Sequence, residues 1–382
     1  MFKSLRPAGN KVHFESKHLA DNLLSPYKFK LYQSGTAALS AALIAAQKVS
    51  SKITNKAKVL LPAYACPDLV SAILHSDAEP ILIDFASGKP WMDLSKIEEM
   101  IDEDVIAIIM VNFLGIPERI EQIRSIIDKQ NIVLIEDSAQ GFPNKSANEY
   151  WNGDIIISSF GRGKPIGLLG GGIALSKNEI LLDALPQTRN TPLNLIDKLK
   201  YFLKSHLYNI LLKPPFYYWI SRVPGIQLGQ TYYKALSELD SCPGYIKKLI
   251  TNNFARYKNQ KLISQEIHNL LKDLNSSQII DLPATCNFNF NSPLLRYPIL
   301  VTDSNIHSEI LIKMTRKGLG VSTMYNDVLP NISGIPGGTF SNKTELLNAE
   351  LFSKQLLTLP THEDVTTKDI ESIKEILQKF LS

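Results

Sequence analysis

Between residues 34 and 185, short apolar runs alternate with stretches of helical periodicity, and this alternation constrains the fold more than any other feature. The runs have the length of buried strands, whereas apolar residues in the stretches between them recur at helical spacing. This order predicts an α/β protein whose mostly parallel sheet is flanked by helices. The expected strands are residues 58–62, 80–84, 105–111, 132–135, 154–158 and 172–175, and the expected helices are residues 37–47, 94–101, 117–129 (with Pro117 as first helical residue) and 177–185.

After residue 244 the pattern changes to a second, smaller unit. A long polar helix is expected over 245–272, a strand over 296–301, and helices over 306–317 and 368–381. A chain of 382 residues has room for two or three structural units. We therefore expect a large domain over 1–190, a helical insert over 191–243 and a small C-terminal α+β domain over 244–382.

Composition restricts the class of protein. The chain is 44% hydrophobic and 20% charged, as expected of a globular protein, and its net charge of +4 is too small to indicate nucleic-acid binding. Three cysteines without metal-ligand spacing favour a reducing cytoplasm and no metal site. We expect neither a signal peptide nor a membrane span, because no apolar core follows the N-terminal charges and no run reaches the roughly 18 residues required.

Two residues whose side chains could take part in a reaction follow expected strands. Lys164 lies in the glycine-rich loop 159–166, where a lysine can be desolvated and attack an aldehyde as the neutral amine. Asp137 closes the strand of residues 132–135. Ligands bind at the carboxyl ends of parallel strands, so both residues are candidates for one site. A surface lysine and a turn aspartate are the structural alternatives.

Five segments resemble, in order and spacing, the DegT/DnrJ/EryC1/StrS family of sugar aminotransferases, which depend on pyridoxal 5′-phosphate (PLP). They are Ser34-Gly35-Thr36-Ala37-Ala38-Leu39, Leu61-Pro62-Ala63-Tyr64, Glu136-Asp137-Ser138-Ala139-Gln140, Ser159-Phe160 with Lys164, and Leu359-Pro360-Thr361-His362. The resemblance covers nearly the whole chain. It implies PLP as cofactor, the architecture called PLP fold type I, and a homodimer with sites at the subunit interface.

For the cofactor ring, the resemblance implies distinct roles. Lys164 is expected to form the Schiff base and to move the proton, Asp137 to keep the ring nitrogen protonated, and Gln140 to hydrogen-bond the ring hydroxyl. Many relatives carry a ring-covering aromatic residue at the position of Cys66. Either Tyr64 supplies this cover or the cover is lost.

For the cofactor phosphate, the resemblance implies contacts from Gly35, Thr36 and Ser159. Backbone N–H groups at a helix start bind phosphate, and threonine adds a hydroxyl. Plain helix capping is the alternative for Thr36 and for Ser34. Asn190 matches a position from which relatives reach the phosphate of the neighbouring subunit, although Thr191-Pro192 departs from the family pattern.

The expected activity is transfer of an amino group from an amino acid, L-glutamate, to a keto group of a nucleotide-linked sugar, for polysaccharide or glycoconjugate biosynthesis. Retention of Lys164 argues against relatives that carry histidine there and act as sugar dehydratases. Because the segment Gly167-Leu168-Leu169-Gly170-Gly171-Gly172 lacks the family's glutamate, two alternatives stay open. One is a non-sugar or lipid-like acceptor, and the other is a non-catalytic, PLP-binding regulatory protein.

Residues 195–235 form an insert that the resemblance does not explain. It contains six basic residues and one acidic residue, hence a net charge of +5. An apolar stripe at helical spacing is followed by Pro214-Pro215 and the aromatic run Phe216-Tyr217-Tyr218-Trp219. An oligomer interface, a cover over the active site and peripheral contact with an anionic membrane are the hypotheses for this segment. The stripe consists of Leu195, Leu199, Phe202, Leu203, Leu207 and Ile210.

Overall fold

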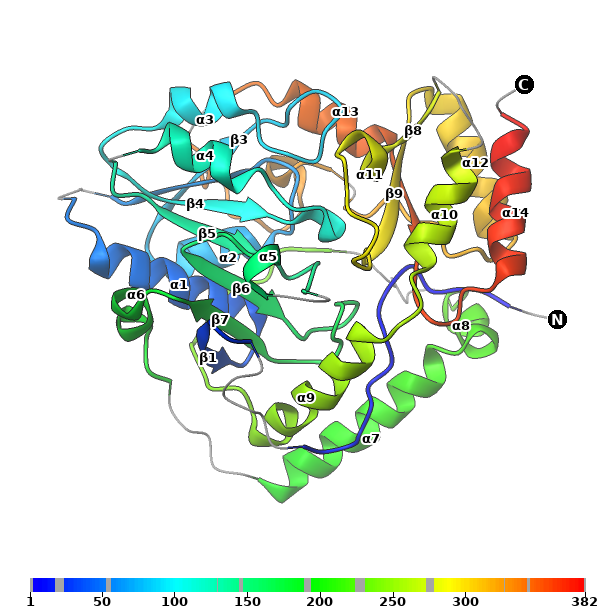
Figure 1. Cartoon of the computed structure of the whole chain (residues 1–382), viewed down its shortest axis with the longest axis horizontal. Coiled ribbons are helices and arrows are strands. Elements are labelled where there is room, and N and C mark those ends of the chain that lie inside the picture. The colour runs from blue at the N-terminus through cyan, green and yellow to red at the C-terminus, as the bar shows by residue number, and fades with distance from the viewer. Residues whose placement is uncertain are drawn as a thin grey trace.

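A computed structural model describes residues 3–17, 24–52, 56–128, 130–143, 147–188, 194–223, 231–272, 278–325, 327–341 and 344–380. In this part of the chain a seven-stranded sheet forms the centre of the larger unit, in the order β1-β7-β6-β5-β4-β2-β3 (Figure 1). The strands from β2 to β6 pair in parallel, whereas β7 pairs antiparallel with β6 and β1. The strands are β1 (Lys28–Tyr32), β2 (Lys58–Pro62), β3 (Glu79–Ile83), β4 (Val105–Val111), β5 (Val133–Asp137), β6 (Ile155–Ser159) and β7 (Gly172–Ser176).

Both faces of this sheet are buried because successive strand residues point to opposite sides. Along β4, Ile109 belongs to the apolar cluster that includes α1, whereas Ile108 and Met110 belong to the cluster that includes α3 and α4. The flanking helices are α1 (Gly35–Val49), α2 (Asp68–His75), α3 (Leu94–Met100), the 3-10 turn η1 (Phe113–Gly115), α4 (Ile120–Ile126), α5 (Ala147–Tyr150) and α6 (Glu179–Ala184).

The smaller unit is built on a three-stranded antiparallel sheet in the order β10-β9-β8. The strands are β8 (Ile279–Asp281), β9 (Arg296–Val301) and β10 (Leu356–Pro360). Helices of this unit pack on one another and on β9 (Figure 1). They are α10 (Ile263–Lys272), α11 (Leu282–Thr285), α12 (Ser304–Arg316), the turn η2 (Leu329–Asn331), α13 (Leu347–Gln355) and α14 (Thr367–Gln378). The predicted α/β class with a small α+β unit is confirmed.

Two expected helices differ from the structure. The helix predicted over 245–272 is two helices, α9 (Gly244–Lys258) and α10, because the Asn259 amide turns back to donate to the Ala255 carbonyl at 2.9 Å and ends α9. The helix predicted from Pro117 begins only at Ile120. Buried Glu118 holds the chain before it, by accepting hydrogen bonds from the N–H groups of Met92 and Arg119 at 3.0 and 2.8 Å.

The insert forms two helices, α7 (Leu195–Leu211) and α8 (Pro214–Ile220), along the lower right margin of Figure 1. The N-terminal segment, blue in Figure 1, runs between α7 and α9. It is held there by Asn209 of α7, whose amide exchanges hydrogen bonds with Val12, and by Asn253 of α9, whose amide does the same with His13. Within the described residues, no helix has both the length and the apolar character to cross a membrane.

Candidate active site

The candidate site lies at the carboxyl ends of β5 and β6, where Asp137 and Ser159 end their strands. The chain after Ser159 forms a closed loop carrying Lys164, the lysine loop (residues 160–171). Phe160 closes it by donating to the Gly171 carbonyl at 2.9 Å and accepting from Leu168 N–H at 2.7 Å. Because β5 pairs with β6, Asp137 and the loop that carries Lys164 lie at the ends of adjacent strands.

Asp137 and Lys164 interact electrostatically in this site. Burial raises the pKa of the Asp137 carboxyl, and the Lys164 charge and the N–H of Ala139 act in the opposite direction. Ala139 N–H donates to Oδ1 of Asp137 at 2.9 Å. A buried carboxylate beside a cation favours protonation of any basic nitrogen placed against it, which is the property that a pyridine ring nitrogen requires.

The predicted phosphate residues also meet. A Cβ atom on Gly35 would lie only 2.6 Å from Cβ of Ser159, so these two residues touch and only glycine fits. The Ser159 hydroxyl accepts a hydrogen bond from Gly161 N–H at 3.3 Å. Ser34 caps α1 by accepting from Ala37 N–H, so the capping alternative holds for Ser34, while Thr36 stands in the first turn of the helix. A helix start, a hydroxyl and a glycine cradle together suit a phosphate group.

Tyr64 lies in a different environment from the one that a ring cover requires. Its side chain is buried, with its ring against those of Phe85, Phe113, Tyr325 and Phe352. Its hydroxyl donates to the Tyr325 carbonyl at 3.0 Å and so ties the larger unit to the smaller one.

Cys66, two residues further on, is the side chain near both Lys164 and Asp137. Burial raises the pKa of the Cys66 thiol to about 12, so the thiol is neutral. This packing favours the interpretation that the aromatic cover is lost and a small apolar side chain takes its place.

Gln140 is buried and both ends of its amide are engaged. Its oxygen accepts from Leu114 N–H at 2.9 Å, and its nitrogen donates to the Tyr325 hydroxyl at 3.0 Å. Burial, with the nearby Cys66 and Asp137 among the further causes, raises the pKa of Tyr325. The Gln140–Tyr325 pair therefore borders the site as neutral hydrogen-bonding groups.

Arg296, at the start of β9, is a residue of the site that the sequence analysis missed. Burial lowers the pKa of its guanidinium, and the titratable groups that act on it are the neutral tyrosines Tyr325, Tyr217 and Tyr64. Its Nη1 donates to the Ser322 hydroxyl at 3.0 Å, but its buried Nε has no hydrogen-bond partner. No acidic residue in the described part of the chain forms an ion pair with it. An arginine opening an apolar strand was the available signal.

The outer side of the lysine loop is held by the insert and by the N-terminal segment. The Tyr201 hydroxyl of α7 donates to the Leu168 carbonyl at 2.9 Å. Asn10 donates from its amide to the Pro165 carbonyl at 2.9 Å.

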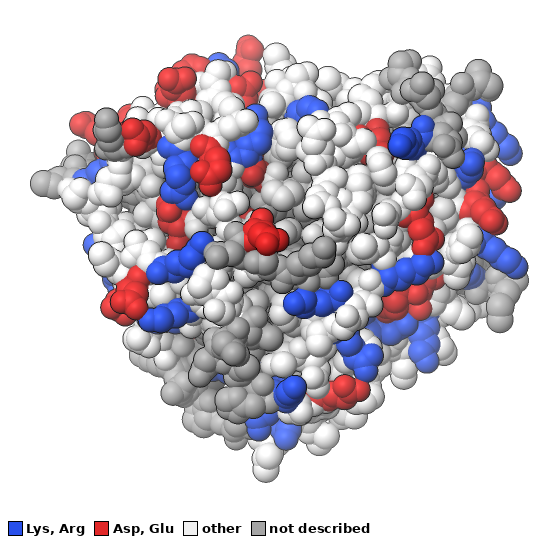
Figure 2. Space-filling model, in the orientation of Figure 1, with Lys and Arg blue, Asp and Glu red and all other residues white. Residues whose placement is uncertain are grey.

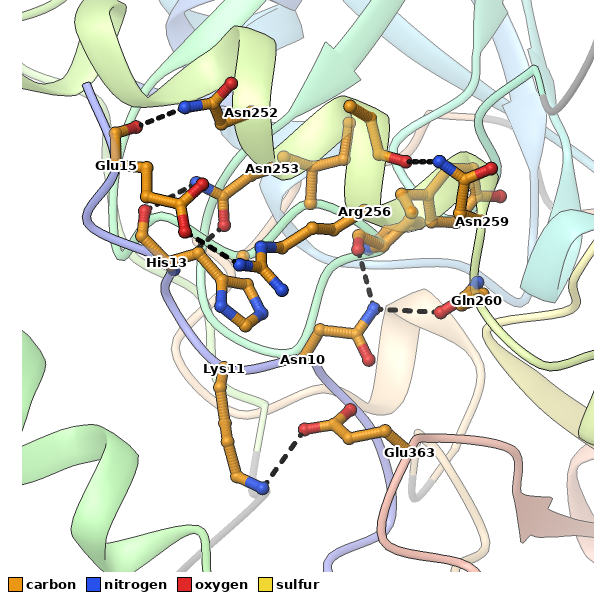
Figure 3. A pocket seen from close by; sticks show the side chains of 15 residues that line it. Asn10, Lys11, His13, Glu15, Asn252, Asn253, Arg256, Asn259, Gln260 and Glu363 are labelled. Carbon is orange, nitrogen blue, oxygen red and sulfur yellow. Dashed lines mark hydrogen bonds and ion pairs between the residues drawn. The ribbon is translucent and has the colours of Figure 1, made fainter. Parts of the chain in front are cut away.

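A pocket of about 570 Å³ adjoins the lysine loop on this side (Figure 3). Amide and charged side chains line it together with Pro165, Ile166 and Gly167 of the loop. Figure 3 shows Asn10, Lys11, His13, Glu15, Asn252, Asn253, Arg256, Asn259, Gln260 and Glu363 around it.

These residues fit PLP. The Gly35–Ser159 contact leaves a cradle that any Cβ would fill, and Asp137 supplies a buried carboxylate beside Lys164. Asn190, predicted to reach a neighbouring subunit, lies outside the described residues. Sheet order, lysine loop and carboxylate together define a protein of the PLP fold type I class.

Comparisons with known proteins narrow this class. A model of the DegT/DnrJ/EryC1/StrS aminotransferase family matches residues 30–378. A GDP-perosamine synthase of Escherichia coli O157:H7 is 33% identical over 39% of this chain and 40% of its own length. A UDP-4-amino-4,6-dideoxy-N-acetyl-beta-L-altrosamine transaminase of Campylobacter jejuni is 28% identical over 73% of this chain and 66% of its own. The chain thus spans less than two thirds of the length of each of these two curated relatives.

The crystal structure of NtdA from Bacillus subtilis, described as having bound cofactor PMP, superimposes with a TM-score of 0.68. It is 19% identical and covers 93% of this chain, which covers 73% of NtdA, so the likeness shows the fold. The chain belongs to the DegT/DnrJ/EryC1/StrS aminotransferase family. The resemblance predicted from the sequence is confirmed, and with it the PLP-dependent class.

Proposed function

We propose that the protein is a PLP-dependent aminotransferase that moves an amino group from L-glutamate to a keto group of a nucleotide-linked sugar. The observation that carries the proposal is the convergence of Lys164, buried Asp137 and the Gly35–Ser159 cradle at the carboxyl ends of adjacent strands. When bound, PLP supplies an electron sink through which an amino group is exchanged for a keto group.

The chain's own residues would divide the remaining work. Lys164 would hold the cofactor through Nζ and would carry the proton in the amino-group exchange. Asp137 holds a proton on the ring nitrogen. Gln140 and Tyr325, joined at 3.0 Å, border the ring with neutral hydrogen-bonding groups.

The choice of an amino-acid donor rests on Arg296. A guanidinium with a buried, unpaired Nε and only tyrosines around it lacks a counter-charge. The carboxylate of an amino acid would supply that charge in the bidentate geometry that arginine favours. This proposal explains why a chain would bury an arginine without an acidic partner among its described residues.

The choice of a sugar acceptor rests on the polar pocket beside the lysine loop. Its amides, including those of Asn252 and Gln260, offer hydrogen bonds to hydroxyl groups, and its two cations, Lys11 and Arg256, are ion-paired with Glu363 and Glu15 of the same lining (Figure 3). By contrast, the leucines of the insert's apolar stripe are exposed. The lipid-like acceptor is therefore less well supported.

We further propose a cytoplasmic homodimer with a peripheral membrane contact through residues 195–235. The sequence match at Asn190, where relatives contact the other subunit's phosphate, supports the dimer. Acidic and basic side chains are intermixed on the face seen in Figure 2, as expected of a protein that does not bind nucleic acid there.

The decisive experiment follows the visible absorbance of the purified protein loaded with PLP. L-glutamate should bleach the band of the lysine-bound cofactor and release 2-oxoglutarate, whereas Lys164→Ala should show no lysine-bound band. A keto-sugar nucleotide should then restore the band of the bleached wild-type protein. A band that no amino acid changes would contradict the aminotransferase and support the regulatory alternative.

A further inference from the structure

Helix α7 turns its apolar face away from the protein core and its more polar face toward it. Only Tyr201 and Ser205 are buried among its 17 residues. The leucines at helical spacing point the other way, and Leu199, Leu203 and Leu207 are 62%, 63% and 56% exposed. Surface helices of globular proteins normally turn such a stripe toward the core. The exposed apolar ridge comprises Leu195, Ile196, Leu199, Leu203, Leu207 and Ile210.

Hydrogen bonds on the inward face prevent α7 from rotating to bury the ridge. Tyr201 hydrogen-bonds the lysine loop at the Leu168 carbonyl, and Asn209 pairs through its amide with the backbone of Val12. Rotating α7 to bury its leucines would break each of these bonds. The ridge is therefore fixed toward the outside. Of the predicted stripe, Phe202 alone is partly covered, against Phe14 and Tyr201.

The charged residues around the ridge indicate the chemistry of the surface to which it binds. Residues 194–223 contain five basic side chains and only one acidic side chain, Asp197. On the helix, Lys198 lies to one side of the leucines and Lys200 and Lys204 to the other. In α8, Phe216 and Trp219 are exposed, as aromatic residues of membrane-interface helices are. A self-interface with two-fold symmetry would bring these like charges together, which disfavours a second copy as the occupant.

We propose that α7 and α8 dock on an anionic lipid bilayer, with the ridge inserted among the acyl chains and the flanking lysines at the headgroups. This inference deepens the proposed peripheral contact by assigning its residues and its lipid chemistry. Because α7 also holds the lysine loop, docking would place this loop on the side of α7 that faces away from the membrane.

Vesicle flotation of the PLP-loaded protein tests this docking. The wild-type protein should float with vesicles containing phosphatidylglycerol and stay behind with phosphatidylcholine alone. Leu199→Glu with Leu203→Glu should weaken partitioning by more than about tenfold, whereas Leu347→Glu with Leu351→Glu, at exposed leucines of α13, should not. Replacing Lys198, Lys200 and Lys204 by glutamine should cost about fivefold for each lysine.

A fluorescence measurement does not depend on how the ridge variants fold. Trp219 is 61% exposed, so its emission should shift to the blue on adding anionic vesicles, and Trp219→Phe should lose this shift. Absence of flotation and of the shift in the wild-type protein would overturn the proposal. Loss of dimers in the ridge variant by light scattering, without vesicle binding by the wild type, would instead identify the ridge as a subunit interface. Neither result changes the glutamate half-reaction, so the two proposals fail separately.

Discussion

Two residues of this site are notable for what is absent beside them: an aromatic ring at Cys66 and an acidic partner at Arg296. Cys66 puts a neutral thiol near Asp137 and Lys164, where a larger ring would cover the cofactor. Arg296 has no acidic partner in the described part of the chain, and its buried Nε is unbonded. Both features leave room and charge for ligands, and Arg296 gives a direct test.

Arg296→Gln should raise the KM for L-glutamate by about 10- to 100-fold, because a charge-assisted pair contributes roughly 1.5–3 kcal/mol. The affinity for PLP should stay unchanged, since the predicted cofactor contacts lie on other residues. Steady-state kinetics with each substrate varied in turn would measure this. Arg316→Gln, at an exposed arginine of α12, is the matched control. A rise in KM for the keto-sugar alone would assign Arg296 to the acceptor.

At the scale of elements, the lysine loop depends on segments distant in sequence. Tyr201 of α7 holds its backbone at Leu168, and Asn10 holds it at Pro165. A glycine-rich loop has little structure of its own because glycine restricts the backbone least. The insert therefore contributes to the order of the loop even though none of its residues is a predicted cofactor contact.

Tyr201→Phe should weaken PLP binding by about fivefold, since the lost hydrogen bond contributes about 1 kcal/mol to ordering the loop. Titration of PLP into the apoprotein, followed by absorbance, measures the change. The control is Tyr232→Phe, at a tyrosine that is 66% exposed. Equal PLP affinities in all three proteins would mean that the loop is ordered without α7.

Local sequence patterns predicted the elements that carry chemistry, and tertiary packing decided the others. The runs ending near Asp137 and Ser159 are strands because short apolar runs rich in β-branched residues are typical of buried strands. The edge strand β1 and the helix α2 were missed; α2 has only eight residues, a length at which an apolar run does not distinguish a helix from a strand. The break at Asn259 depends on a side chain folding back on its own helix, and the position of Arg296 depends on two units meeting, so neither could be read from periodicity.

At the scale of the whole molecule, both ends of the chain meet the insert at Arg6. This side chain is 1% exposed, and its Nε and Nη1 donate to the carbonyls of Gly9 and Leu212 at 2.8 and 3.2 Å. Its Nη2 lies 2.9 Å from Glu363, and its Nη1 is ion-paired with Asp364. The N-terminal segment, the end of α7 and the chain before α14 are thereby held at one point. The contacts of Arg6 therefore keep these three parts of the chain together around the active site.

Arg6→Ala should lower the free energy of unfolding by roughly 2–3 kcal/mol, less than the about 3–5 kcal/mol of a fully buried pair because the carboxylates are partly exposed. Urea denaturation measures this, with Lys28→Ala, in an exposed ion pair, as a control that should change nothing measurable. Burial raises the pKa of Asp364, but hydrogen bonds from Arg6 and Lys11 outweigh it and lower the pKa below 3.8. That stabilisation is present above 3.8 and is lost as pH falls through the folded value, so the difference between wild type and variant should shrink in acid. A difference independent of pH would show that Arg6 acts through its carbonyl contacts, and Asp364→Asn should then be silent.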